Sequence, residues 1–242
     1  MIRWSLPPQA RGVWVKIPAI EVVEVLARSG IDFIVIDCEH SQIHSQMMST
    51  MIAVARGLGL PAFVRVSSPD AREVQGALDA GATGIFFPHV DDASIAQEAV
   101  GACRFPPVGH RRGSPTTRAG YWGEATVEGM RESSDGVIVV AQIESPEAID
   151  QLERILTIEG IDGVFLGPFD LAISSDLKPQ DDEFRQLLDR FEHAAGGRVP
   201  MGGAAHGPPA TAELDRRGYD FVMIGADTTL LSDATQVGLG GS

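Results

Sequence analysis

Eight short runs rich in β-branched and aromatic residues recur along the chain, and amphipathic segments of helical periodicity separate most of them. The runs predicted to be strands are residues 12–17, 33–37, 61–66, 84–90, 136–144, 162–167, 198–203 and 220–225. The segments predicted to be helices are residues 19–30, 45–59, 70–82, 92–104, 145–160 and 209–218. Several of these segments end in Gly, as helices often do.

This alternation predicts an α/β protein with a single (β/α)8 barrel, the TIM barrel. Eight strands in a chain of 242 residues leave about 30 residues per unit, which is the size of a βα repeat in such a barrel. An open doubly wound sheet would also alternate, but its first strand is usually followed by a Gly-rich phosphate-binding turn. No such turn follows residues 12–17, so the closed barrel is favoured.

We expect one domain over residues 1–242, with a short flexible Gly-rich tail from about residue 235. The longest irregular stretch, residues 104–123, is rich in Pro, Gly and Arg. Loops of that length inside a compact domain are usually functional or mobile. Its basic charge suits contact with an anion or another subunit, and a solvated connector is an equally good interpretation.

The overall charge narrows the class of partner. A formal net charge of -14 disfavours non-specific binding to nucleic acid or to an anionic membrane, because both are negative. Cys38 and Cys103 form neither a disulfide framework nor a zinc-ligand spacing. No signal peptide and no apolar run of about 18 residues is found. These features predict a cytoplasmic protein that binds small molecules.

Titratable side chains appear where the predicted strands end. The second run, "DFIVIDCEHS", turns abruptly from apolar residues to Asp37, Glu39 and His40. The other polar residues at strand ends are Arg65, His89, Gln142, Glu144, Asp170 and Asp227. Active sites of (β/α)8 barrels lie at these ends. Taken singly, Asp170 and Asp227 are more simply explained as helix caps, and His89 as a structural residue.

Two of these carboxylates suit a hard metal ion. Gln142 and Glu144 lie two residues apart and therefore on the same face of a strand otherwise built for burial, where a carboxylate is costly unless it is compensated. Glu144 and Asp170, at the ends of neighbouring strands, would offer oxygen ligands to Mg2+ or Mn2+. Arg65 would add a fixed cation, and the turn "GPFD" would present backbone N–H groups to a substrate carboxylate.

Four motifs in this order resemble the HpcH/HpaI family of metal-dependent pyruvate aldolases: "VIDCEH", "VRV", "QIESPEA" and "DGVFLGPFDLA". The resemblance runs from about Gly12 to Leu231. It implies a (β/α)8 barrel and a class II aldolase that reversibly cleaves a 4-hydroxy-2-oxo acid to pyruvate, or a close 2-oxo acid, and an aldehyde. The cofactor it implies is Mg2+ or Mn2+, with Co2+ as a further candidate.

The resemblance also implies roles for residues. Glu144 and Asp170 correspond to metal ligands, and Arg65 to the residue that faces the keto oxygen of the substrate. Gln142 corresponds to a polar residue beside the metal. The remaining residues expected to bind substrate are Gly167, Pro168 and Phe169.

The same family pattern makes His40 the acid/base histidine. Asp79 corresponds to a carboxylate that pairs with this histidine from a neighbouring subunit of a homo-oligomer, a trimer or a hexamer. Asp37 is a second candidate for orienting His40, and Glu39 is expected to support the site by hydrogen bonding. Imidazole suits this role because it exchanges protons near neutral pH.

Other functions fit the pattern less well. The chain has two lysines, and only Lys16 at the end of the first predicted strand is placed to form an imine. An acyl-CoA lyase of the citrate-lyase or malyl-CoA-lyase type would need a basic groove for the CoA phosphates, which the net charge disfavours. A barrel that binds a 2-oxo acid without catalysis would not need the complete set of candidate residues.

Overall fold

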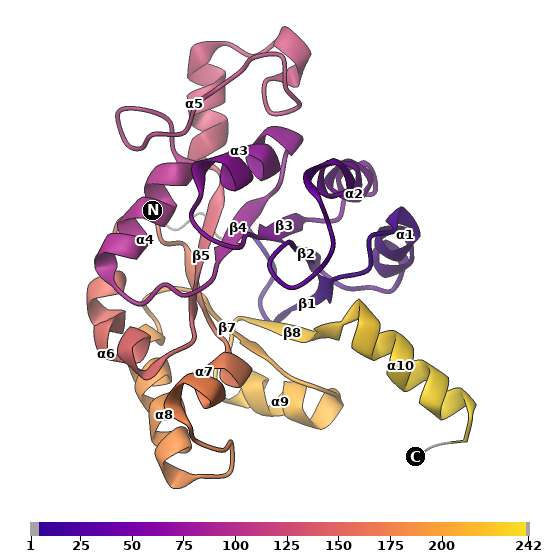
Figure 1. The fold of residues 1–242 in the computed structure, drawn as a ribbon, viewed down its shortest axis with the longest axis vertical. Coiled ribbons are helices and arrows are strands. Elements are labelled where there is room, and N and C mark those ends of the chain that lie inside the picture. The colour runs from indigo at the N-terminus through magenta and orange to yellow at the C-terminus, as the bar shows by residue number, and fades with distance from the viewer. Residues whose placement is uncertain (1–4, 241–242) are drawn as a thin grey trace.

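Eight parallel strands close into a barrel in chain order, with helices around it (Figure 1). The computed structural model describes residues 5–240. The strands are β1 (Ala10–Val15), β2 (Phe33–Asp37), β3 (Ala62–Arg65), β4 (Gly84–Phe87), β5 (Ile138–Ile143), β6 (Gly163–Leu166), β7 (Met201–Ala204) and β8 (Phe221–Ala226). The predicted (β/α)8 barrel is confirmed.

In the part of the chain that the structure describes, ten α-helices and one short 3-10 helix lie between the strands or, for the last helix, after β8. They are α1 (Ile20–Arg28), α2 (Ser45–Gly57), α3 (Ala71–Ala80), α4 (Ala93–Cys103), η1 (Tyr121–Gly123), α5 (Val127–Asp135), α6 (Pro146–Ile155), α7 (Pro168–Ser175), α8 (Asp182–Ala195), α9 (Pro208–Arg216) and α10 (Asp227–Gly238). Within residues 5–240, no helix combines the length and apolar content needed to cross a bilayer.

Two of these helices, α5 and α8, lie outside the segments predicted to be helical. Helices α7 and α10 were expected only as the helices that Asp170 and Asp227 would cap, without bounds of their own. Helix α8 is amphipathic, packs beside α6, and buries Phe184, Leu187 and Phe191 in the main hydrophobic core. Helix α10 continues to Gly238, past the point near residue 235 where a tail was expected. A terminal Gly weakens a helix by only about 1 kcal/mol relative to Ala, so it does not stop this one.

Aromatic rings fill the inside of the barrel. Phe63 and Phe86 meet edge to face with ring centroids 5.6 Å apart, and Phe33 meets Phe63 at the same distance. Gly12 makes room for this layer, because a Cβ there would lie 2.3 Å from Cζ of Phe33. The interior below the mouth is therefore a packed core, and polar chemistry is confined to the strand ends.

Residues 104–135 extend beyond the barrel as a projection formed by η1, α5 and their connecting loops (Figure 1). Its base is held by the buried Arg104, which donates to the carbonyl oxygens of Ser134 and Val137 at 2.9 and 2.8 Å. The long irregular stretch is thus anchored at its start, and a single 3-10 turn interrupts it before α5.

Candidate active site

A cavity of about 500 Å³ opens at the carboxyl ends of the strands. Its lining combines charged side chains with small and aromatic ones. The residues are Trp14, Lys16, His40, Arg65, Gln142, Glu144, Phe165, Gly167, Pro168, Phe169, Asp170, Ala204 and Ala226. Most of the site residues expected from the sequence therefore meet at one place.

The Asp37 carboxylate lies buried beneath this cavity, where five N–H donors surround it. Arg65, at the end of β3, binds it with both ends of its guanidinium, Nε to Oδ1 at 3.0 Å and Nη2 to Oδ2 at 2.6 Å. The Lys16 ammonium lies 3.1 Å from Oδ2. The backbone N–H groups of Glu39 and His40 donate to Oδ1. Burial opposes ionisation and is the largest single influence, but Arg65, the His40 N–H and Lys16 together outweigh it, and the pKa of Asp37 is lowered from its ordinary value.

Asp37 therefore orients the Arg65 side chain. It contacts His40 only through the backbone N–H of that residue, not through the imidazole ring. The His40 ring is half exposed, and its Nε2 lies 3.6 Å from Oε2 of Glu39. Glu39 also lies 3.3 Å from Nη1 of Arg65. The nearest carboxylate to the candidate acid/base is thus Glu39, which the sequence assigned only a supporting part.

Glu144 follows β5 and is held by neighbours on two sides. Gln142 Nε2 donates to its Oε1 at 2.6 Å, and the backbone N–H of His89 donates to its Oε2 at 3.1 Å. Gly167 allows this packing, because a Cβ there would lie 2.6 Å from the Glu144 side chain. Burial raises the pKa of Glu144, and the nearby charge of Asp170 adds to the rise despite the hydrogen bond from His89.

This donor set fits a hard divalent cation. Glu144 and Asp170 line the same cavity, and the buried Oε1 of Gln142 has no hydrogen-bond partner among the described residues. Two carboxylates in one cavity repel each other, and a divalent cation relieves that repulsion; a buried amide oxygen without a partner is a further sign of a missing ligand. Across residues 5–240, no group of three His, Cys, Asp or Glu side chains could hold a metal ion, and Glu144 and Asp170 are the two candidate ligands that line this cavity.

Helix α7 brings the "GPFD" segment to the cavity. Gly167 precedes the helix, Pro168 occupies its first turn, and Asp170 lies in that turn with its side chain at the cavity. Asp170 therefore does not cap the helix, which was the simpler interpretation of the sequence. Phe169 also lines the cavity, although 75% of its surface is exposed.

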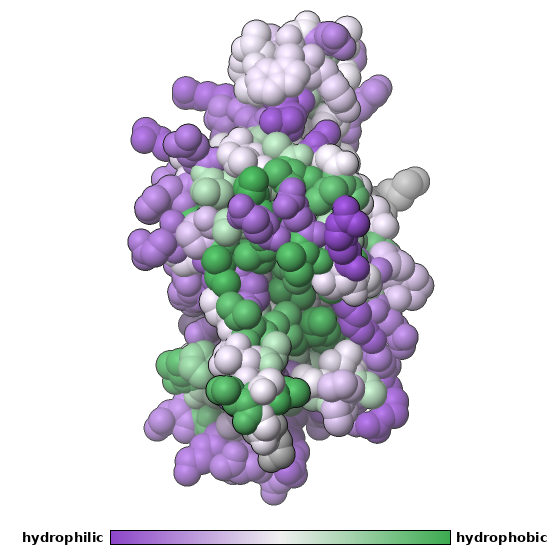
Figure 2. Space-filling model, turned by 90° about the vertical axis from the view of Figure 1, so that its right-hand side faces the viewer, coloured by the Kyte–Doolittle hydropathy of each residue, from purple (hydrophilic) through white to green (hydrophobic). Residues whose placement is uncertain are grey.

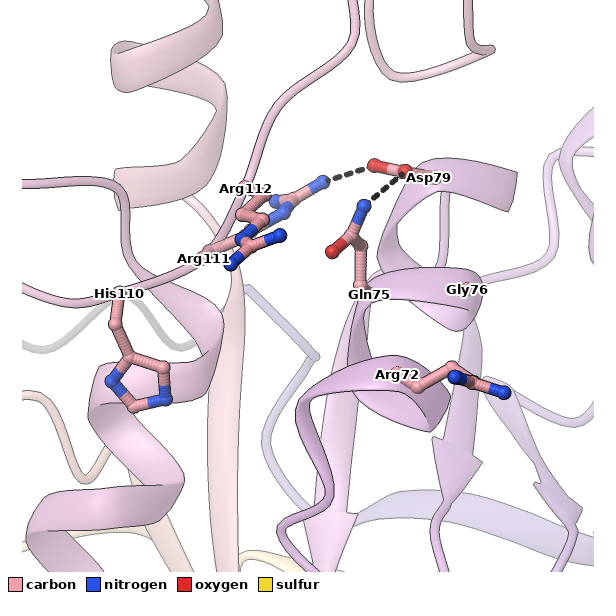
Figure 3. A pocket seen from close by; sticks show the side chains of 7 residues that line it. All are labelled: Arg72, Gln75, Gly76, Asp79, His110, Arg111 and Arg112. Carbon is pink, nitrogen blue, oxygen red and sulfur yellow. Dashed lines mark hydrogen bonds and ion pairs between the residues drawn. The ribbon is translucent and has the colours of Figure 1, made fainter.

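Asp79 lies elsewhere, on α3, in a second cavity shown in Figure 3. Its Oδ1 accepts from Nη2 of Arg111 at 3.0 Å, and its Oδ2 lies 3.5 Å from Nε2 of Gln75. His40 is not among the residues lining this cavity. Asp79 and His40 therefore do not pair within one chain, and a contact between them would have to join two subunits.

The structure also adds two residues that sequence reasoning left out of the site. The His89 ring, which was interpreted as structural, has Nε2 3.5 Å from Glu39 and Nδ1 3.6 Å from Glu144. Its φ of 52° is in the left-handed region, which is uncommon for a residue other than Gly and frequent at functional sites. The other is Lys16, whose only sequence signal was its position at a strand end.

A sequence profile of HpcH/HpaI aldolase/citrate lyase matches residues 11–234, which is most of the chain. The chain belongs to this family. The comparison confirms the resemblance seen in the four sequence motifs and supports the expected aldolase activity.

Relatives within the HpcH/HpaI family align over most of the barrel. A 2-keto-3-deoxy-L-rhamnonate aldolase from Escherichia coli is 36% identical over 233 residues, 92% of this chain and 85% of the relative. A 4-hydroxy-2-oxo-heptane-1,7-dioate aldolase from Salmonella paratyphi C is 34% identical over 226 residues, 91% and 85% of the two chains. A crystal structure of a family protein from Burkholderia cenocepacia superposes with a TM-score of 0.92 at 29% identity, covering 99% and 96%.

Proposed function

We propose that this protein is a class II aldolase that reversibly cleaves a 4-hydroxy-2-oxo acid to pyruvate, or a close 2-oxo acid, and an aldehyde. The observation that carries the proposal is the joint placement of Glu144, Asp170 and Arg65 in one cavity at the strand ends. The names of the two relatives, both aldolases that act on oxo acids, support it. Glu144 and Asp170 would hold Mg2+, Mn2+ or Co2+.

When bound, the divalent ion supplies the positive charge that stabilises an enolate. Arg65 faces the keto oxygen and adds a second charge, held in one orientation by its two bonds to Asp37. In the first turn of α7 the backbone N–H groups of Phe169 and Asp170 are the ones offered to the substrate carboxylate. Pro168 has no N–H, and the N–H of Gly167 donates to the carbonyl oxygen of Ile143. Gln142 keeps the Glu144 carboxylate in place through its hydrogen bond.

His40 removes the proton from the 4-hydroxyl group, the C4–O bond becomes the carbonyl of the departing aldehyde, and the electron pair of the C3–C4 bond passes to C3 as the enolate of the 2-oxo acid. A proton taken up at C3 then converts this enolate to pyruvate. In the reverse direction His40 returns this proton to the aldehyde oxygen. Its ring is exposed at the cavity, where it can reach a substrate. Asp79 of a second subunit pairs with His40 in the assembly, and Arg111 presents the Asp79 carboxylate for this contact (Figure 3).

A homo-oligomer, a trimer or a hexamer, is part of this proposal, as is a cytoplasmic location. Hydrophobic side chains gather on the side of the molecule from which α10 extends (Figure 2). Val25 on α1 and Leu231 and Val237 on α10 are each more than 60% exposed. Apolar surface of this kind marks contacts between proteins.

The decisive experiment follows exchange of the pyruvate methyl protons with deuterium by NMR, with and without added Mn2+ or Mg2+. An aldolase of this class exchanges these protons only when metal is present. A barrel that merely binds a 2-oxo acid shows no exchange, and that result would refute the proposal. A screen of pyruvate with a panel of aldehydes then identifies the acceptor, and malyl-CoA in the same screen tests the acyl-CoA lyase alternative.

A further inference from the structure

Lys16 is a cation at the mouth of the barrel that the proposed reaction does not use. It follows β1, lines the cavity, and has 29% of its side chain exposed. Among residues 5–240, the ammonium has one charged partner, Asp37, at 3.1 Å. An ammonium has three N–H donors, so at least one remains for a ligand in the cavity.

The backbone around Lys16 is fixed by a buried carboxylate. Asp227 accepts hydrogen bonds from the backbone N–H of Lys16 at 3.0 Å and of Ile17 at 2.9 Å. Trp14, two residues earlier on the same face of the strand, lies under the Arg65 guanidinium with its ring centroid 4.4 Å from Cζ. Lys16 is therefore held at the cavity by the fold.

The charge of Lys16 exceeds what Asp37 needs. Arg65 already forms a two-pronged ion pair with Asp37, and two backbone N–H groups complete its hydrogen bonding. Glu39, 3.3 Å from Nη1 of Arg65, balances the second positive charge, so what Lys16 offers an anion in the cavity is the hydrogen-bonding capacity of its ammonium that Asp37 does not use. A carboxylate on the substrate is such an anion.

Lys16 lies across the mouth from the carboxylates that would hold the metal. In the closed order of eight strands, β1 is four strands away from β5, which carries Glu144 at its end. The intervening wall on the β7 and β8 side presents Ala204 and Ala226 to the cavity. Their small side chains leave room for a substrate that reaches from the Glu144 side to the ammonium.

We propose that Lys16 binds a second carboxylate of the substrate, so that the site selects dianionic 4-hydroxy-2-oxo acids. The inference rests on the proposed function, because it names the substrate class of that same site. The second carboxylate belongs either to the 2-oxo acid or to the aldehyde. The chemistry is the same in both cases, and the two arms of the experiment distinguish them.

The test compares Lys16→Met and Lys16→Arg with Lys178→Met, which removes the other lysine at an exposed position. In the first arm, calorimetry on Mn2+-loaded protein measures the Kd of 2-oxoglutarate and of 2-oxopentanoate, which differ only in the terminal carboxylate. In the second arm, kcat/KM with pyruvate is measured for succinic semialdehyde and for butanal, which differ in the same way.

In the arm that corresponds to the true place of the second carboxylate, Lys16→Met should reduce the preference for the carboxylate-bearing compound by about tenfold or more. This is the size of a charge-assisted hydrogen bond. Lys16→Arg should keep part of the preference, and Lys178→Met should match the wild type. Equal loss for both members of each pair would overturn the proposal, because Lys16 would then act only through Asp37 and Arg65.

A second result would also overturn it. If borohydride added with pyruvate attached the reduced pyruvate to Lys16, as seen by mass spectrometry, this lysine would be an imine-forming nucleophile. Failure of the proposed function is a separate result. In that case the wild-type protein does not exchange the methyl protons of pyruvate with deuterium, even when metal is present. The calorimetric comparison of the two 2-oxo acids tests Lys16 in that case too.

Discussion

Arg65 covers the whole edge of the Asp37 carboxylate, with Nε 3.0 Å from Oδ1 and Nη2 2.6 Å from Oδ2. The two residues end neighbouring strands and are direct register partners in the sheet. Both side chains are buried. A guanidinium held by two parallel bonds has one orientation, so the β2–β3 pairing sets the direction in which Arg65 points into the cavity.

The change Asp37→Asn should destabilise the fold, because it removes the buried carboxylate that binds Arg65 through two hydrogen bonds and leaves only Glu39, at 3.3 Å, to balance the guanidinium. We expect a loss of about 3–5 kcal/mol in the free energy of unfolding at pH 7, as for other buried pairs that lose one partner. The control is Asp150→Asn, whose pair with Arg190 is exposed and worth at most about 1 kcal/mol. Urea unfolding measures both, and equal effects would contradict the buried-pair interpretation.

The stabilisation from Asp37 should depend on pH with a defined sign. The folded-state pKa of Asp37 is lowered from its ordinary value of 3.8, so the carboxylate stabilises the fold fully above that pH. This contribution to stability decreases as the pH falls below 3.8, and it is lost once the pH has fallen below the lower pKa of the folded state. The difference in unfolding free energy between the wild type and Asp37→Asn should therefore become smaller at acidic pH. It should stay constant across the neutral range, from about pH 6 to about pH 8.

The change Glu144→Gln should remove metal binding while stabilising the metal-free protein. Burial and Asp170 raise the pKa of Glu144, so its ionised form is disfavoured in the fold, and a neutral amide relieves that cost. The Kd for Mn2+ should rise at least about tenfold, since even an outer partner of a metal ligand is worth that much. Calorimetry and Tm with and without Mn2+ measure the two effects.

The matched control is Glu147→Gln, an exposed carboxylate in the first turn of α6. It should bind Mn2+ as the wild type does. A Glu144→Gln protein that still gains Tm with Mn2+ would show that this carboxylate is not a ligand.

The change His40→Ala should impair aldol cleavage far more than binding of oxalate, a mimic of the enolate. The ring stands at the cavity and its loss leaves Arg65, Glu144 and Asp170 in place. We expect a fall in kcat of about 10²–10⁴, the usual contribution of a general acid or base. His44→Ala removes an exposed imidazole four residues away and should leave both quantities unchanged. Equal losses of cleavage and oxalate binding by His40→Ala would indicate a structural histidine.

The change Gly12→Ala should destabilise the barrel without touching the active site. The new Cβ would lie 2.3 Å from Cζ of Phe33 and 2.8 Å from Sδ of Met223, so the aromatic layer would have to shift. Overpacking of this kind costs about 1–3 kcal/mol. Gly57→Ala, at the end of α2 with nothing within 4 Å of the new Cβ, should instead be neutral or slightly stabilising. Thermal unfolding of the two variants gives the comparison.

Much of the barrel could be predicted, because its strands are specified by local patterns of apolar and polar residues in the sequence. The run from Phe33 to Ile36 is apolar on both faces, as a strand between a packed interior and a helical layer must be. The strand-end rule then brings His40, Arg65 and Glu144 to one mouth. The start of α7 was placed too late, after Asp170, because the apolar residues of β6 continue directly into this helix, with no change of pattern at Gly167.

The amino-acid sequence by itself determined the fold class, the family and most of the residues at the mouth, because strand periodicity and motif order depend on near neighbours in the chain. Only the tertiary structure decided which charges meet. It joined Asp37 to Arg65 and Lys16, placed His89 beside Glu39 and Glu144, and left Asp79 with Arg111 in another cavity. Charge pairing acts over a few ångströms between residues far apart in sequence, so it exists only once the strands close.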